Sequence, residues 1–266
     1  MPAGRTPGNK TICMKRPKII KYARRALLKV LVPELIWPRY VLVENVKIKI
    51  RNTPYSYGTK RIILRGGYEE AERVLIKDQI AEGDVVIEMG GSIGIITALL
   101  ADKVGETGYI VSVEASEELT RYSRTWLEKN NVRIVTGYGF PVNRLSSAIQ
   151  IENFDTSDGS LGGTVRYALS GEGKTPKQMP DNIFDLEKLC NIFKLVPTVL
   201  MIDVEGSEKI IVSQEPDFPK SVRTIIIELH PHFYPVEDMN RIIERITNEG
   251  FQLKNQVSSS YLFTRG

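Results

Sequence analysis

The chain has 266 residues, 42% of them hydrophobic, and a formal net charge of +4. This length allows one large domain or two small ones with a substantial buried core. The two cysteines, Cys13 and Cys190, form no Cys-x-x-Cys pair, which argues against a disulfide framework or a zinc–cysteine site. No apolar run approaches the roughly 20 residues that span a bilayer, and the start lacks a signal-peptide pattern. We therefore expect a cytoplasmic protein.

The positive charge is concentrated at the start of the chain, where nine lysines and arginines precede the first acidic residue, Glu34. Between Lys18 and Trp37 apolar residues recur at helical spacing, which predicts an amphipathic helix with a basic face, ending near Pro33. Such a segment can contact anionic lipid or nucleic acid, or can be a solvated leader. We expect peripheral membrane contact through residues 10–37.

A small β-ribbon is predicted next, because residues 40–50 alternate apolar and polar side chains and Arg61–Leu64 offers a second short strand. Turn-forming residues, among them Pro54 and Gly58, lie between the two. We therefore assign residues 1–66 to an N-terminal extension and residues 67–266 to the main domain.

The main domain alternates short apolar strands with helices. Strands are predicted at 85–89, 109–114, 132–135, 198–204, 224–229, 251–253 and 261–264, and helices at 68–80, 93–104, 117–130, 207–214 and 236–248. This alternation predicts a doubly wound α/β fold with a mostly parallel seven-stranded sheet covered on both faces. The long connection at about 137–197 starts at the carboxyl edge of the sheet, where ligands bind, so we assign it to substrate recognition or active-site cover.

A glycine-rich turn follows the first strand of this domain and contains Gly90, Gly91, Ser92 and Gly94. Such a turn lets the backbone approach a ligand closely and presents the N–H groups of a helix N-terminus. By itself it is weakly specific, because dinucleotide enzymes place a similar turn there. Glu88, in the strand end, can bind the cationic amino-acid portion of S-adenosylmethionine directly or through water, whereas it would repel a pyrophosphate.

Glu114 ends the next strand, where a carboxylate can accept hydrogen bonds from both ribose hydroxyls of a nucleoside. Dinucleotide-binding folds share this feature, so Glu114 indicates a nucleoside without saying which one. Each glutamate could instead be a surface residue at a strand end. Taken together, the positions predict a methyl-donor site formed by Glu88, Gly90, Gly91, Ser92, Gly94 and Glu114.

Three segments, residues 83–94, 199–208 and 225–230, resemble the FkbM family of methyltransferases. The most specific of them contains Ile-Asp-Val-Glu-Gly-Ser-Glu at residues 202–208, and the resemblance runs from about Tyr68 to the C-terminus. It implies the class I (Rossmann-like) methyltransferase fold and S-adenosylmethionine-dependent O-methylation of a hydroxyl on a sugar, glycolipid or natural-product acceptor. Family members usually have lysine at the position of Met201, so any role of that lysine is missing here.

Candidate catalytic residues follow the fourth and fifth strands of the domain. Asp203 and Glu205 come after the fourth strand, and Glu228, His230 and His232 come at the end of the fifth. An alcohol attacks a methyl group faster as its proton leaves, which a base or a divalent metal promotes. We predict that Asp203, Glu205 and His230 are catalytic, with His230 as the base; alternatively, Glu228 and His230 only tie loops together. Asp203, Glu205 and Glu228 also form a candidate Mg²⁺ site.

Three other functions stay open. The basic start favours an RNA methyltransferase, but the chain has neither an Asn/Asp-Pro-Pro-Tyr/Phe motif after the fourth strand nor an RNA-binding module, so we do not expect a nucleic-acid acceptor. Met201 and the divergent long connection favour a non-catalytic, membrane-associated protein on a methyltransferase scaffold. The third open function is that of an NAD-dependent oxidoreductase. The oligomeric state is not encoded in any recognisable pattern.

Overall fold

The computed structural model describes residues 34–128, 131–139, 149–155, 164–169, 182–210 and 218–266. The amphipathic helix predicted before Pro33 lies outside these residues. The described N-terminal part begins with the 3-10 helix η1 (Glu34–Ile36) and the antiparallel hairpin β1 (Tyr40–Val43) and β2 (Val46–Lys49). In the part of the chain that is described, no helix is long and apolar enough to cross a membrane.

The predicted strand at Arg61–Leu64 is wrong, because these residues end the helix α2 (Tyr57–Leu64). The side chain of Ser56 accepts a hydrogen bond from the backbone N–H of Thr59 and so caps the start of this helix. Ile63 is buried against the core, whereas Ile62 is half exposed. The three apolar residues that follow Arg61 are too few for periodicity to separate a strand from the last turn of a helix.

A seven-stranded sheet forms the centre of the main domain, as predicted. Its order is β12-β13-β11-β10-β3-β4-β5. The strands span β3 (Val85–Met89), β4 (Tyr109–Glu114), β5 (Val132–Thr136), β10 (Val199–Ile202), β11 (Thr224–Glu228), β12 (Gln252–Val257) and β13 (Ser260–Thr264). The five strands from β5 to β11 run parallel, and β13 lies antiparallel between β11 and β12. A dinucleotide-binding sheet has the order 3-2-1-4-5-6 and lacks this inserted strand.

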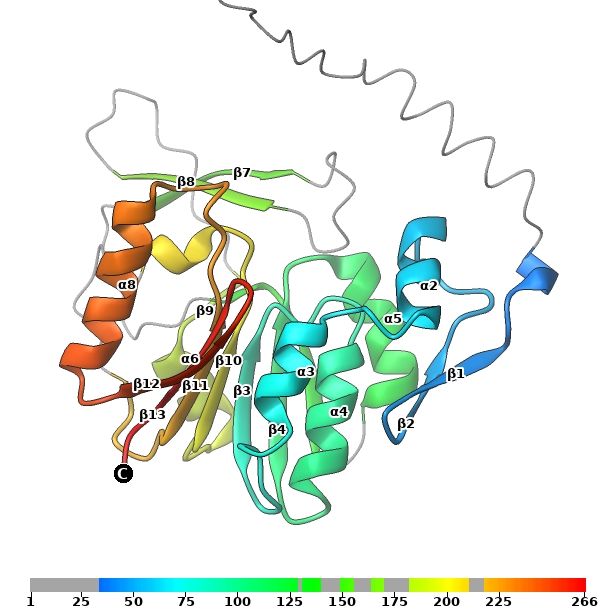
Figure 1. The fold of residues 1–266 in the computed structure, drawn as a ribbon, viewed down its shortest axis with the longest axis horizontal. Helices are drawn as coiled ribbons and strands as arrows, with labels where there is room; N and C mark the ends of the chain where they lie inside the picture. Colours follow the sequence, from blue (N-terminus) through cyan, green and yellow to red (C-terminus); the bar gives the residue numbers. More distant parts are fainter. Residues whose placement is uncertain (1–33, 129–130, 140–148, 156–163, 170–181, 211–217) are drawn as a thin grey trace, which may run out of the picture.

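Helices cover both faces of the sheet (Figure 1). Successive strand residues point to opposite faces, so Val86 joins one hydrophobic cluster and Ile87 the other. The first cluster includes residues of α3 (Glu70–Ile76), α4 (Ile95–Val104) and α5 (Glu117–Leu127), and the second includes residues of α6 (Leu186–Phe193) and α8 (Val236–Asn248). The predicted helix at 207–214 is described only in its first turn, η2 (Ser207–Lys209). This covering on both faces explains why the central strands are almost continuously apolar.

The long connection between β5 and β10 contains regular structure. Strands β6 (Tyr138–Gly139) and β9 (Ile183–Phe184) pair in parallel, and β7 (Ile149–Asp155) and β8 (Thr164–Leu169) form an antiparallel pair. In Figure 1 this second pair lies above the carboxyl edge of the sheet, and β8 lies near η2. The connection is therefore positioned next to the predicted catalytic residues.

Candidate functional site

The glycine turn is fixed by the space around it. Gly90 has φ +94°, and a β carbon built on it would lie 1.6 Å from the backbone carbonyl oxygen of Asp203. A β carbon on Gly94, which precedes α4, would lie 2.3 Å from the Leu127 side chain. The backbone N–H of Asp203 donates to the Met89 carbonyl at 2.8 Å. The turn is thus packed between the end of β10 and α5.

Glu88 lies beneath this turn and not on the open surface. Its side chain is 2% exposed and accepts a hydrogen bond from the Thr97 hydroxyl of α4 at 2.6 Å, and burial raises its pKa. A β carbon on Gly91 would contact both Glu88 and Ser112. Met201 is the register neighbour of Glu88 on β10 and is also buried. Glu88 is therefore a buried carboxyl group behind the turn, and its contact with a ligand stays a prediction.

Glu114 connects the turn to the start of α5. Its carboxylate accepts the backbone N–H groups of Ser92 at 2.8 Å and of Ser116 at 2.7 Å. Burial raises its pKa to about 7, against the opposing effect of these two hydrogen bonds. Ser92 itself has φ +46° and its hydroxyl lies 3.4 Å from that of Tyr68. A carboxyl group, a glycine-rich turn and a helix N-terminus meet here, which fits a nucleoside donor.

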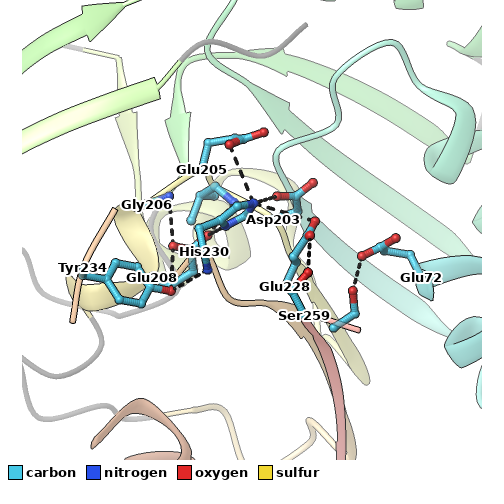
Figure 2. A network of polar contacts seen from close by, with 11 residues as sticks. Glu72, Asp203, Glu205, Gly206, Glu208, Glu228, His230, Tyr234 and Ser259 are labelled. Carbon is cyan, nitrogen blue, oxygen red and sulfur yellow. Dashed lines mark hydrogen bonds and ion pairs between the residues drawn. The ribbon is translucent and has the colours of Figure 1, made fainter. Parts of the chain in front are cut away.

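His230 lies at the centre of a second polar cluster, beyond the ends of β10 and β11 (Figure 2). Its Nδ1 lies 2.9 Å from Glu208 Oε1, and its Nε2 lies 3.5 Å from Asp203 Oδ1. The Glu205 and Glu228 carboxylates both lie 3.7 Å from Nε2. The sequence-predicted catalytic residues are therefore brought together, although they come from two different strand ends. We call Asp203, Glu205, Glu228 and His230 the acidic–histidine cluster.

The charges around His230 favour its protonated form. Burial lowers its pKa, but the hydrogen bond to Glu208 and the charges of Glu208, Glu205 and Glu228 raise it to about 9. Both ring nitrogens then carry protons at neutral pH, and neither can accept another. His230 can serve as the predicted base only where the surrounding negative charge has been neutralised.

Glu208 is a further site residue, which the sequence shows only as the last residue of the Ile-Asp-Val-Glu-Gly-Ser-Glu segment. It is fully buried and accepts the backbone N–H of Gly206 at 2.9 Å, with the Val204 N–H and the Tyr234 hydroxyl each at 3.3 Å. These donors together with His230 use both carboxylate oxygens. Its fixed place in the Ile-Asp-Val-Glu-Gly-Ser-Glu segment was the one available signal.

Two further carboxyl groups, Glu69 at the N-cap of α3 and Glu72 within it, lie near this cluster. Burial raises the pKa of Glu69 to about 8, and its neighbours Glu72, Glu88 and Glu228 raise it further. Glu72 is 3% exposed and accepts a hydrogen bond from the Ser260 hydroxyl. The pKa of Asp203 is raised well above its ordinary value by burial and by the surrounding carboxylates. The site thus concentrates acidic groups that need a positive partner.

A comparison with known families matches residues 71–162, about a third of the chain, to protein-L-isoaspartate(D-aspartate) O-methyltransferase. The matched segment contains the glycine turn and Glu114. The sheet has the inserted antiparallel strand β13, which separates it from dinucleotide-binding sheets. The chain has the class I S-adenosylmethionine-dependent methyltransferase fold. The fold and the matched segment support an S-adenosylmethionine-dependent methyltransferase.

Solved structures with similarity to this methyltransferase fold include two fibrillarins. Aeropyrum pernix fibrillarin with natively bound S-adenosyl-L-methionine has 15% identity and a TM-score of 0.40, over 69% of this chain and 66% of that chain. Methanococcus jannaschii fibrillarin, a pre-rRNA processing protein, has 12% identity and a TM-score of 0.45, over 85% of this chain and 81% of that chain. A Pyrococcus furiosus methyltransferase has 16% identity and a TM-score of 0.41, over 92% of this chain and 98% of that chain. The matched region thus spans just under two thirds of the first fibrillarin. No curated protein matches the sequence.

Proposed function

We propose that the protein is an S-adenosylmethionine-dependent O-methyltransferase of the FkbM type, acting on a hydroxyl of a sugar, glycolipid or natural-product acceptor. The observation that carries this proposal is the contact between the two halves of the site. Gly90 of the donor turn packs directly on the Asp203 backbone, whose side chain belongs to the acidic–histidine cluster. Transfer to oxygen also agrees with the name of the matched family, an O-methyltransferase.

The donor side of the proposal assigns a task to each residue around the turn. S-adenosylmethionine supplies an electrophilic methyl group on a sulfonium centre. We assign the ribose hydroxyls to Glu114, and the start of α4 offers the backbone N–H groups that a helix N-terminus leaves without intrahelical partners. Glu88, buried behind the turn, adds negative charge that favours a cationic donor over a pyrophosphate.

The acceptor side is assigned to the acidic–histidine cluster. Asp203 Oδ1 is buried and accepts no hydrogen bond from the described residues, so it is available to a hydroxyl donor. Glu205 has φ +48°, and a non-glycine residue held in this region costs roughly 1–3 kcal/mol, as is common at functional sites. We assign Asp203, Glu205 and His230 the task of orienting the acceptor, and His230 takes up its proton only where the surrounding negative charge has been neutralised. Strands β7 and β8, beside this site, are proposed to help bind the rest of the acceptor.

We further propose that the N-terminal part contacts an anionic membrane through residues 10–37 and the neighbouring hairpin. The described part of this region exposes large apolar side chains: Leu35 is 79% exposed, Ile36 67% and Leu42 69%. They follow the basic segment that contains nine lysines and arginines. Apolar anchors beside clustered positive charge are the combination that binds interfacial membrane proteins. This location would suit a glycolipid acceptor.

Methyl transfer with labelled S-adenosylmethionine tests the proposal. The full chain would be incubated with a panel of hydroxylated glycans and glycolipids, with RNA, and with an isoaspartyl peptide. We expect label in the glycan or glycolipid fraction and its loss in the Asp203→Asn variant. Label in RNA or in the peptide alone would overturn the acceptor class. If S-adenosylhomocysteine does not bind at all, the protein is a non-catalytic member of the fold.

A further inference from the structure

The imidazole of His230 has one nitrogen in use and one without a hydrogen bond. Its side chain is 7% exposed, and Nδ1 is paired with Glu208 at 2.9 Å. On the other side of the ring, Nε2 faces three carboxylate oxygens at 3.5, 3.7 and 3.7 Å. These distances exceed the 2.7–3.2 Å of ordinary N–H···O hydrogen bonds. Nε2 of this nearly buried side chain therefore lies beside three carboxylate oxygens at distances longer than those of hydrogen bonds.

We propose that the acidic–histidine cluster binds a divalent first-row transition metal ion, such as Mn²⁺ or Zn²⁺, through His230 Nε2 and the carboxylates of Asp203, Glu205 and Glu228. Metal–ligand bonds of about 2.0–2.2 Å hold neighbouring ligand atoms roughly 3.0–3.6 Å apart in octahedral or tetrahedral sites. The 3.5 Å from Nε2 to Asp203 lies within this range, and the 3.7 Å to Glu205 and to Glu228 exceed its upper end by about 0.1 Å, so small side-chain movements suffice. Ligand atoms of Asp203, Glu208 and His230 all lie within 4.8 Å of one another.

We assign Glu208 the task of orienting His230, and not that of binding the ion directly. Its carboxylate already accepts hydrogen bonds from the backbone of Val204 and Gly206 and from Tyr234. It also fixes Nδ1 of His230, which leaves Nε2 as the ligand atom. A metal-bound histidine almost always donates its second N–H to a carboxylate or carbonyl in this way. The arrangement is therefore that of a metal ligand and its orienting partner.

Glu228 and Asp203 each have a carboxylate oxygen available to an ion. Glu228 uses Oε1 to accept from the Ser259 hydroxyl at 2.7 Å, and it turns Oε2 toward His230. Asp203 Oδ1 is buried and accepts no hydrogen bond from any described residue. Among the residues that the structure describes, His230 is the one cationic side chain paired with Asp203, Glu208 or Glu228. A divalent cation would supply the missing positive charge.

The nitrogen ligand decides which metal is expected. Mg²⁺ prefers an all-oxygen shell, whereas imidazole with carboxylates suits Mn²⁺, Fe²⁺, Co²⁺ and Zn²⁺. The inference departs from the Mg²⁺ site of Asp203, Glu205 and Glu228 expected from sequence, because the structure adds His230 to the same cluster. Metal binding itself does not depend on the proposed function. Only its catalytic consequence rests on that function, because a bound ion would lower the pKa of an acceptor hydroxyl beside it.

Calorimetric titration of the full chain, stripped with a chelator and free of methyl donor, tests this inference. We expect one Mn²⁺ or Zn²⁺ per chain and at least tenfold weaker binding of Mg²⁺. The His230→Ala variant should bind Mn²⁺ at least tenfold more weakly, and Glu208→Gln about 10–100-fold more weakly. His232→Ala is the matched control: it removes the other histidine, which is exposed and packs on Phe233, and should leave the affinity unchanged.

Visible absorption of the Co²⁺ complex adds a readout of the ligand itself, and it should change in His230→Ala and not in His232→Ala. S-adenosylhomocysteine binding verifies that the variants are folded. Absence of Mn²⁺ and Zn²⁺ binding, or equal affinity in wild type and His230→Ala, would overturn the site. Intact metal binding without methyl transfer to any acceptor would contradict the proposed function alone.

Discussion

The backbone carbonyl of Asp203 fills the space that a β carbon on Gly90 would need, leaving 1.6 Å between that oxygen and the position of the missing atom. Gly90 also has φ +94°, which L residues with side chains rarely adopt. The donor turn and the acidic–histidine cluster are thus in direct contact. A substitution that moves the backbone at Gly90 should therefore also move Asp203, and the reverse.

The Gly90→Ala variant should lose both stability and donor binding. The clash is with backbone and cannot be relieved by a side-chain rotation, so we expect destabilisation of about 3 kcal/mol or more. Urea unfolding and calorimetric titration with S-adenosylhomocysteine measure the two effects. Gly67→Ala is the control, because its β carbon would meet nothing closer than 3.9 Å, and it should change neither. Unchanged donor affinity in Gly90→Ala would contradict the assignment of the turn.

The pH dependence of stability should depend on Glu114. Its pKa is raised from 4.5 to about 7 in the fold, mainly by burial. The stability it contributes is therefore full below about pH 4.5 and is lost as pH rises through about 7, by on the order of 3 kcal/mol. Urea unfolding between pH 5 and 8 measures this slope, and Glu114→Gln should flatten it. Identical slopes in the two proteins would contradict the raised pKa.

Donor affinity should show the opposite trend with pH. Ribose hydroxyls donate to the ionised carboxylate of Glu114, so affinity for S-adenosylhomocysteine should rise between pH 6 and 8. In Glu114→Gln the affinity should fall by about tenfold or more at pH 8, since one acceptor oxygen is lost. A glutamine variant that binds the ligand as tightly as wild type at pH 8 would remove Glu114 from the site.

The Thr97 hydroxyl should be needed for the buried charge behind the turn. It donates to Glu88 at 2.6 Å, and both groups are buried. Thr97→Val keeps the shape but leaves the carboxyl without this donor, which should cost about 1–3 kcal/mol. Thermal unfolding measures the loss, and Thr97→Ser, which keeps the hydroxyl, is the control. Equal stability of the valine and serine variants would show that the bond contributes nothing.

Membrane contact should depend on the exposed apolar residues of the N-terminal part. The double variant Leu35→Ser, Ile36→Ser should reduce flotation with vesicles that contain anionic lipid, and neutral vesicles should bind weakly. Val196→Ser is the control: Val196 is 68% exposed but belongs to the main domain. Absence of flotation by the unmodified chain would reject the membrane proposal.

Most of the sheet was predictable from sequence because its strands are short, apolar and covered on both faces. Residues 85–89, 109–114 and 236–248 match the structure without adjustment, since strong periodicity and clear end signals coincide there. Arg61–Leu64 failed because a short apolar run fits a helix end equally well. The strands within residues 137–197 were missed because glycine and polar residues dominate that stretch.

The site was predictable in its residues and less so in its geometry. Asp203, Glu205 and His230 meet because parallel strands end at one edge of the sheet. The sequence does not encode that Glu88 is buried under Thr97, or that Glu208 holds the imidazole from behind. Glu69 and Glu72 lie far from the signature in the chain, and only the packing of α3 brings them near it.

The most direct test of the account is calorimetric titration of the full chain with S-adenosylhomocysteine and, separately, with NADH. We expect binding of one S-adenosylhomocysteine per chain, weakened in Gly90→Ala and Glu114→Gln, and no binding of NADH. Binding of NADH without binding of S-adenosylhomocysteine would contradict it.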